Sequence, residues 1–282
     1  MLPLMVEKEC FIMAWVDKFK NWLGEEPSII TNENKIVRIF SFKHNIVDNL
    51  IMSDWAKHFR EHYCLDTEID IMRDGTGLTR SEYLTNMKFP DKSAAPGPSI
   101  RAGDFGEILV ADYLEFIMNY WVPRTRYSRK TIKNESTKGS DIIGFKFIDD
   151  TESPKDTLAV FEAKANFVSR MDNRLNDAIN DSAKDRIRDA ESLNAIKQRF
   201  IDNKEFDKVR NISRFQNPSD KPYKKIYGAV ALFSNDIFTE ENIKEATIVK
   251  HPHPNNLELI TIKGDDMMTL VHELYKRASD EA

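Results

Sequence analysis

The sequence predicts an α/β (α+β) protein, because short strand-like runs of apolar residues alternate with longer segments of helical periodicity. Residues 140–147 and 158–164 show the strand pattern most clearly, since both are rich in β-branched and aromatic side chains. The loop between them is polar and contains a Ser-Pro pair, which is typical of a turn. At 282 residues, the chain is long enough for one large domain or two small ones.

The first part, residues 1–90, is expected to be a small mixed α/β region. Alternating and periodic apolar residues predict its elements: a helix over 11–22, a strand over 35–42, a helix over 47–63 and a strand over 68–72. No catalytic constellation is found in it, so we interpret it as a region that binds a partner or guides the substrate.

Two pairs of histidines raise the question of a metal site. His58 and His62 lie four residues apart, so they share one face of the predicted helix at a spacing that metal sites use. A solvated helix face is the more frequent explanation of such a pair, and we favour it. His251 and His253 are interleaved with prolines, and a turn explains them better than a metal does.

A linker is predicted over residues 91–102, because residues 89–103 contain three prolines together with Gly, Ser and Ala, and proline blocks a helix. The second part, residues 103–282, then begins with a helix for which Asp104 is a plausible N-cap. Glu107 lies one turn into that helix, where it could support a site or simply complement the helix dipole. Gly106 before it would allow another part of the chain to approach closely.

The segment from Pro123 to Lys138 is the most basic in the chain and is predicted to be a strand and loop. It sets six basic residues against the single acid Glu135: Arg124, Arg126, Arg129, Lys130, Lys133 and Lys138. The whole chain has a net charge of −5, so any contact with DNA has to come from a local patch such as this one. We therefore expect these residues to hold a DNA backbone; the alternative is an exposed strand without a partner.

Beyond the strand over residues 158–164, the pattern continues with alternating elements. A long helical pattern spans residues 179–200, strands are predicted over 225–233 and 256–262, and a closing helix is predicted over 265–278.

Three charged residues interrupt the apolar strands of the central hairpin: Asp141, Glu162 and Lys164. Charged side chains are rarely buried unless they are paired or bind a metal. Because strand side chains alternate, Glu162 and Lys164 share one face, and Asp141 is expected to converge on Glu162 from the neighbouring strand. Two adjacent carboxylates favour a hard cation such as Mg²⁺. A simple ion pair between Glu162 and Lys164 is the alternative, but it leaves Asp141 unexplained.

An aspartate followed about twenty residues later by Glu-x-Lys on a second strand resembles the PD-(D/E)XK nuclease superfamily. The sequence departs from the motif at Ser140, which stands where a proline is usual. The order of elements over residues 103–235 is also similar. The resemblance implies a restriction-endonuclease-like core, with a central mixed sheet flanked by helices, as the nuclease domain. It also implies that Glu107 supports the metal site.

More narrowly, the chain resembles the HamA family, the nuclease subunits of the Hachiman anti-phage defence system, in its Asp-Phe-Gly-Glu helix, its Glu-Ala-Lys strand and its small N-terminal region. The resemblance implies a DNA endonuclease with a helicase partner similar to HamB. Mg²⁺, or Mn²⁺ in its place, would be held by Asp141, Glu162, Glu107 and the backbone carbonyl of Ala163, and Lys164 would act beside it. A sequence-specific restriction endonuclease and a non-catalytic DNA-binding assembly subunit remain alternatives.

The expected location is the cytoplasm. Cys10 and Cys64 give no disulfide framework, as in proteins of a reducing compartment. The apolar residues near the N-terminus are interrupted by three charged residues, so neither a signal peptide nor a membrane span is expected.

Overall fold

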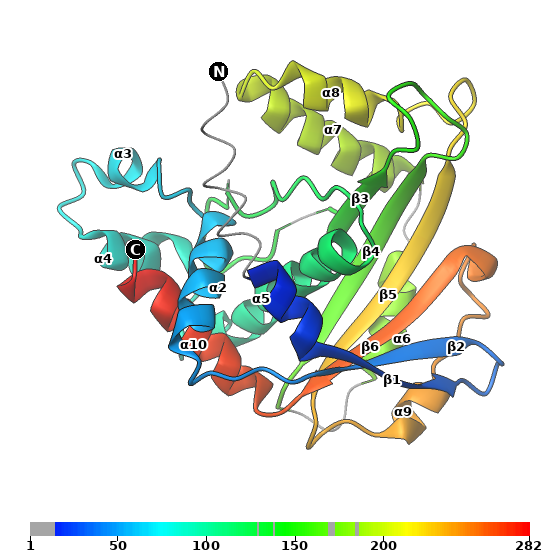
Figure 1. Cartoon of the computed structure of the whole chain (residues 1–282), viewed down its shortest axis with the longest axis horizontal. Helices are drawn as coiled ribbons and strands as arrows, with labels where there is room; N and C mark the ends of the chain where they lie inside the picture. The colour runs from blue at the N-terminus through cyan, green and yellow to red at the C-terminus, as the bar shows by residue number, and fades with distance from the viewer. Residues whose placement is uncertain (1–14, 129, 138, 169–172, 184–185) are drawn as a thin grey trace.

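A six-stranded mixed sheet forms the centre of the computed structural model, which describes the chain except for residues 1–14, 129, 138, 169–172 and 184–185 (Figure 1). The strands follow the order β1 (Leu23–Ile30), β2 (Ile36–Phe42), β6 (Leu257–Gly264), β5 (Lys224–Ser234), β4 (Thr157–Asn166) and β3 (Ile142–Lys146). The four inner strands are parallel, whereas β1 and β3 run antiparallel at the edges. The predicted class, a mixed sheet flanked by helices, is confirmed.

Both faces of the sheet are covered because its inner strands are apolar on both sides. On β5, Val230 and Leu232 point into one core, and Ala229 and Ala231 point into the other. The first core is closed by α2 (Asn49–Glu61), α5 (Gly97–Asp112), α10 (Met267–Asp280) and the helical residues 15–22. The second is closed by α6 (Arg174–Ser182) and α9 (Glu240–Lys244).

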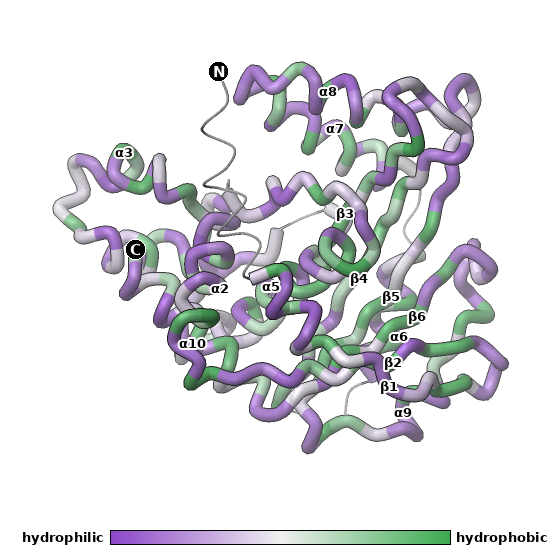
Figure 2. Tube along the Cα trace, in the orientation of Figure 1, coloured by the Kyte–Doolittle hydropathy of each residue, from purple (hydrophilic) through white to green (hydrophobic). Residues whose placement is uncertain are grey.

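A third core lies at the β3 edge. There α7 (Arg186–Asp202) and α8 (Phe206–Ser213) pack over β3 and β4, and Leu193, Phe200 and Ile212 meet Phe145 and Val160. Figure 2 shows hydrophobic residues concentrated in the central strands, whereas α7 and α8 carry many hydrophilic residues on the outside. The first and third cores both contain residues of β3 and β4, so they fix the hairpin in which the charged residues lie.

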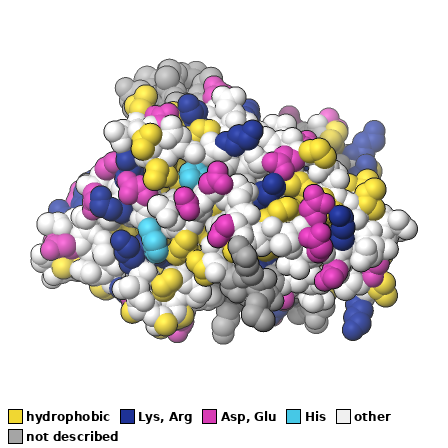
Figure 3. Space-filling model, turned by 90° about the horizontal axis from the view of Figure 1, so that it is seen from below, with side chains coloured by type: hydrophobic (Ala, Val, Ile, Leu, Met, Phe, Trp, Pro, Cys, Tyr) yellow, Lys and Arg dark blue, Asp and Glu magenta, His cyan; other side chains and the backbone are white. Residues whose placement is uncertain are grey.

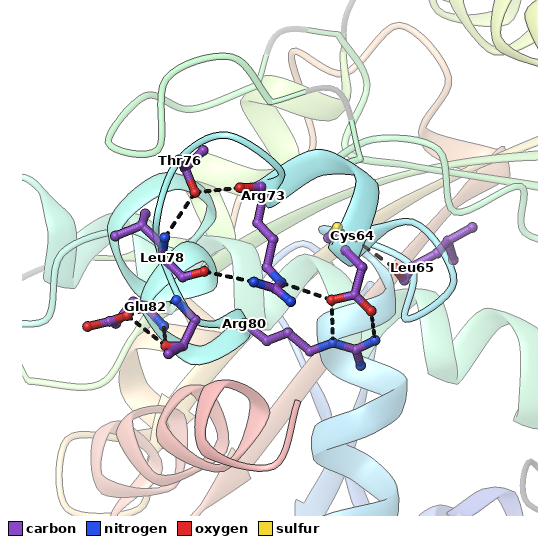
Figure 4. Close-up of polar contacts among 9 residues, drawn as sticks. Cys64, Leu65, Arg73, Thr76, Leu78, Arg80 and Glu82 are labelled. Carbon is purple, nitrogen blue, oxygen red and sulfur yellow. Dashed lines mark hydrogen bonds and ion pairs between the residues drawn. The ribbon is translucent and has the colours of Figure 1, made fainter.

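One predicted strand in the first part is wrong. Residues 68–72 do not form a strand; most of them belong to the short helix α3 (Ile69–Arg73), which leads into α4 (Arg80–Tyr83) and the π-helical turn η1 (Leu84–Lys88). Ile71 is 77% exposed, so its apolar side chain is not buried against the sheet. Ile69, Tyr83 and Leu84 anchor the unit in the first core. Arg73 and Arg80, labelled in Figure 4, both pair with Asp70 at its surface.

The first and second parts of the chain share the sheet. Strand β2 pairs in parallel with β6, Val37 opposite Leu259, and one core contains residues from both parts. The predicted linker is partly helical, because α5 begins at Gly97; Asp104 therefore lies inside the helix and is not its N-cap. The division of the chain into residues 1–90 and 103–282 stays a prediction.

The basic segment is not a strand. An isolated bridge between Trp121 and Phe145 follows the π-helical turn η2 (Tyr113–Ile117), and the described residues of the basic segment after it form only turns, bends and irregular backbone. The other predicted strands and the closing helix are confirmed, with small shifts at their ends. Among the described residues, no helix combines the length and apolar character needed to cross a membrane.

Candidate nuclease site

The hairpin of β3 and β4 positions the first two acidic residues. Asp141 directly precedes β3, and its neighbour Ile142 pairs with Phe161, so Asp141 lies across from Glu162 on β4. Oδ2 of Asp141 accepts a hydrogen bond of 3.2 Å from the backbone N–H of Ala163. Glu162 is only 1% exposed. The register thus brings a fixed aspartate and a buried glutamate to the same end of the hairpin.

Glu107 reaches this end from α5. The helix can lie close to the sheet at this point because Gly106 has no side chain; a Cβ there would be 3.3 Å from Ala165 on β4 and from Leu232 on β5. The phenol of Tyr127 donates a hydrogen bond to Glu107. Burial and the nearby charge of Asp141 raise the pKa of Glu107 to about 8, although Arg126 opposes that rise.

Arg126 lies between the two carboxylates. Its Nε is 2.7 Å from Oε2 of Glu107, and its Nη2 is 2.8 Å from Oδ1 of Asp141. The same guanidinium donates to the backbone carbonyls of Ser140, at 2.6 Å, and Thr137, at 3.1 Å. Burial acts against its charge, but the fields of Glu107 and Asp141 outweigh burial and raise the pKa of Arg126. An arginine therefore joins two of the predicted metal ligands.

Lys164 faces a partner that the sequence did not indicate. Its Nζ is 2.5 Å from Oδ2 of Asp181 in α6. Burial lowers the pKa of Lys164, but the hydrogen bond to Asp181 and the fields of Asp141 and Glu162 raise it by more, so the ammonium stays charged. Lys164 therefore lies within the electrostatic reach of both carboxylates of the hairpin.

A cavity of about 710 Å³ opens beside Glu107, Arg126 and Asp141, whereas Glu162 and Lys164 are not among the residues that line it. Its walls come from α5, the basic segment, the start of β3 and α7, which contributes Ser192 and Arg199. The space is large enough for part of a nucleotide chain. Asp141 is held where it borders that space.

The basic residues predicted to bind DNA are paired with acids. Lys130 lies 2.7 Å from Asp104 with both side chains buried, and Lys133 lies 2.5 Å from Asp91. Arg124 pairs with Asp112 and Glu115, both at 2.6 Å, and Arg126 pairs with Glu107 and Asp141. Arg129 and Lys138 lie outside the described residues. In this conformation the described basic side chains form ion pairs within the protein. Their contact with DNA stays a prediction.

On the face of the molecule shown in Figure 3, basic and acidic side chains are interspersed and do not gather in a broad basic patch. Attraction of a nucleic acid to this face would therefore depend on a few side chains rather than on one continuous positive surface.

His58 and His62 are not on a solvated helix face. Together with Asp112 they form a cluster whose potential metal-binding atoms all lie within 4.8 Å of one another. The guanidinium of Arg124 is 2.9 Å from Nε2 of His62 and 2.6 Å from Oδ1 of Asp112. Burial and the charge of Arg124 hold the pKa of His62 well below its usual value, so His62 is a neutral acceptor. Arg124 thus supplies the positive charge of this cluster, as Arg126 does beside Glu107 and Asp141.

The donor set of the hairpin suits a hard divalent cation. Glu107, Asp141 and Glu162 supply carboxylate oxygens, which Mg²⁺ and Mn²⁺ prefer over nitrogen or sulfur. Arg126 contacts both Glu107 and Asp141, and Asp141 lies across from Glu162 on the adjoining strand, so the three carboxylates gather at this end of the hairpin. The role of the Ala163 carbonyl stays a prediction; its N–H is the group seen to contact Asp141.

Sequence reasoning missed two partners of the site, Tyr127 and Asp181. Tyr127 was visible only as an aromatic residue within a basic run, and Asp181 as one of many charges on a mixed helix. Both act through contacts between distant segments, for which a single sequence carries no signal.

Comparison with known proteins identifies a family for the chain. None of the curated proteins that were compared with the chain matches it. The model of the HamA family matches residues 17–278, which is nearly the whole chain. The chain therefore belongs to the HamA family and so to the Hachiman anti-phage defence system.

Proposed function

We propose that the chain is a metal-dependent DNA endonuclease and the effector subunit of a Hachiman complex with a helicase partner. The observation that carries this proposal is the arrangement of Asp141 and Glu162 on adjoining strands, with Lys164 two residues further along and Glu107 close by. A buried acid pair with a lysine beside it is costly for a fold unless it serves chemistry.

In this proposal Asp141 and Glu162 hold Mg²⁺ or Mn²⁺, with Glu107 assisting. The bound ion would supply a water of lowered pKa and offset the charge that develops on the phosphate. Asp141 is oriented by the Ala163 N–H. Lys164, which Asp181 orients and keeps charged, stabilises the negative charge of the attacked phosphate. DNA enters along the cavity beside Asp141.

The test is cleavage of plasmid and linear DNA by the purified chain with Mg²⁺, with Mn²⁺ and with EDTA. We expect Glu162→Ala and Lys164→Ala to lower metal-dependent cleavage by about a hundredfold or more. The matched control is Lys225→Ala, because Lys225 is also a strand lysine paired with a helix aspartate, Asp189, but lies outside the site. It should cut like the wild type.

The same assay is repeated with any helicase encoded next to the gene for the chain and with ATP. Cleavage only in that mixture would mean that the helicase releases the nuclease. Wild-type rates in Glu162→Ala or Lys164→Ala would overturn the site. DNA binding without cleavage in every mixture would favour a non-catalytic assembly subunit, and discrete bands would favour a sequence-specific endonuclease.

A further inference from the structure

The guanidinium of Arg126 lies between the carboxyl groups of Glu107 and Asp141. It contacts a carboxylate oxygen of each, at 2.7 Å and 2.8 Å. The other oxygen of Asp141 is held by the N–H of Ala163. The carboxylate oxygen of Asp141 that the backbone leaves available is therefore the one that Arg126 uses.

The arginine is also fixed in place by the backbone. The carbonyls of Ser140 and Thr137 accept two further hydrogen bonds from it. Its side chain is only 15% exposed. A guanidinium that is already oriented loses little conformational freedom in binding carboxylates, so it is an effective competitor for them.

We propose that Arg126 is an internal counter-ion that competes with the divalent cation for Glu107 and Asp141, so that the metal binds fully only when the guanidinium leaves. This inference rests on the proposed function, since it requires a metal at these carboxylates. The phosphates of DNA are a natural destination for the displaced guanidinium, because arginine pairs with phosphate as it does with carboxylate.

The competition restrains the nuclease through the metal site itself. While Arg126 contacts Oε2 of Glu107 and Oδ1 of Asp141, a divalent cation has to displace the guanidinium to reach these oxygens. Once a DNA backbone reaches the cavity, the arginine has an alternative anion and the carboxylates become available. Metal affinity should therefore rise when DNA is bound, and by reciprocity DNA affinity should rise when metal is bound.

The direct test is the binding of Mn²⁺ to the purified chain, measured by isothermal titration calorimetry without DNA. We expect Arg126→Gln to bind Mn²⁺ roughly tenfold more tightly than the wild type, because two charge-assisted contacts no longer compete. Asp141→Asn should remove the binding heat and so identify the site. Lys133→Gln is the control, since it removes the same charge from the same segment but from a pair with Asp91.

If Arg126→Gln does not fold, a second variant, Arg126→Lys, tests the same inference. Lysine keeps the charge but cannot reproduce the forked contacts, so it should bind Mn²⁺ more tightly than the wild type by a smaller factor. Thermal unfolding gives a second readout: Mn²⁺ should raise the melting temperature of the Arg126 variants more than that of the wild type.

The outcomes separate this inference from the proposed function. Binding of Mn²⁺ that depends on Asp141 but is equally strong, or weaker, in the folded Arg126 variants would overturn the counter-ion and leave the nuclease intact. Absence of Mn²⁺ binding from the wild type and from every variant would overturn both.

Discussion

At the scale of single residues, Asp112 is the most deeply buried charged group near the site. It is fully buried, between His58 at 2.9 Å and Arg124 at 2.6 Å. Burial alone would raise its pKa, but the fields of His58 and Arg124 lower the pKa of Asp112 to about 2. The ionised carboxylate is thus favoured in the folded chain, and its charge contributes to stability.

A pH-dependent stability follows. The folded-state pKa of Asp112 lies below the ordinary value of 3.8, so its contribution is present above about pH 4 and is lost as the pH falls through 3.8 toward about 2. Asp112→Asn should therefore lower the free energy of unfolding at neutral pH by about 2 kcal/mol. The difference should shrink toward pH 3, as measured by urea unfolding.

The control for that series is Asp280→Asn, which affects an exposed pair with Lys276 and should change stability by less than about 0.5 kcal/mol. A difference between wild type and Asp112→Asn that stays constant with pH would show that Asp112 contributes through packing and not through its charge.

Single residues also mark the limit of what the sequence could predict. Asp141, Glu162 and Lys164 were recognisable because charges within apolar strands are unusual. Arg126 was recognised only as one base among six and assigned to DNA, because a sequence shows how many charges a segment has but not which of them turn inward. Its contacts with Glu107 and Asp141 depend on the packing of α5 against the start of β3.

At the scale of elements, α5 is the one that positions the site. It carries Asp104 and Glu107. Each forms an ion pair with a residue of the basic segment, Asp104 with Lys130 and Glu107 with Arg126. The helix lies close to β4 and β5 because Gly106 leaves room for Ala165 and Leu232. The placement of Glu107 therefore depends on a residue with no side chain.

Gly106→Val should lower the free energy of unfolding by about 1–3 kcal/mol, because the new side chain would meet Ala165 and Leu232 and push the helix from the sheet. Gly103→Ala is the matched control on the same helix. A Cβ there has no neighbour within 4 Å, so the variant should be as stable as the wild type or more stable by about 0.5–1 kcal/mol. Equal urea midpoints for Gly106→Val and the wild type would contradict the close contact.

The elements that periodicity predicted correctly are strands of the sheet or helices that pack against it. Strands β2, β5 and β6 and the helix α10 all show apolar periodicity because the cores require it. The predicted strand over residues 68–72 and the predicted basic strand failed for the opposite reason. Both segments lie outside the sheet, and their charged residues form ion pairs there, Asp70 with Arg80 and Arg126 with Glu107.

At the scale of the whole molecule, the two parts of the chain are tied by a shared sheet and a shared core. Trp55 and Phe59 of α2 lie in the same core as Phe105 of α5 and Leu274 of α10. Neither part can lose its structure without exposing apolar surface of the other.

We therefore expect thermal unfolding to be one cooperative transition, with equal calorimetric and van't Hoff enthalpies. A fragment of residues 103–282 should fail to fold, because β6 would lose β2 as its neighbour and α10 would lose α2. Two separate transitions, or a folded fragment, would instead support a division of the chain at the predicted linker.

The pairing of β2 with β6 has a consequence for synthesis of the chain. β2 can pair with β1 at once, but its pairing of Val37 with Leu259 of β6 has to wait until most of the chain has been made. Parallel pairing between such distant segments is also slow, because a long loop has to close before the contact forms. The hairpin of β3 and β4, by contrast, pairs neighbouring segments. Newly made chains thus have the acidic hairpin before the sheet is complete, and their recovery in folded form should depend on chaperones and on growth temperature.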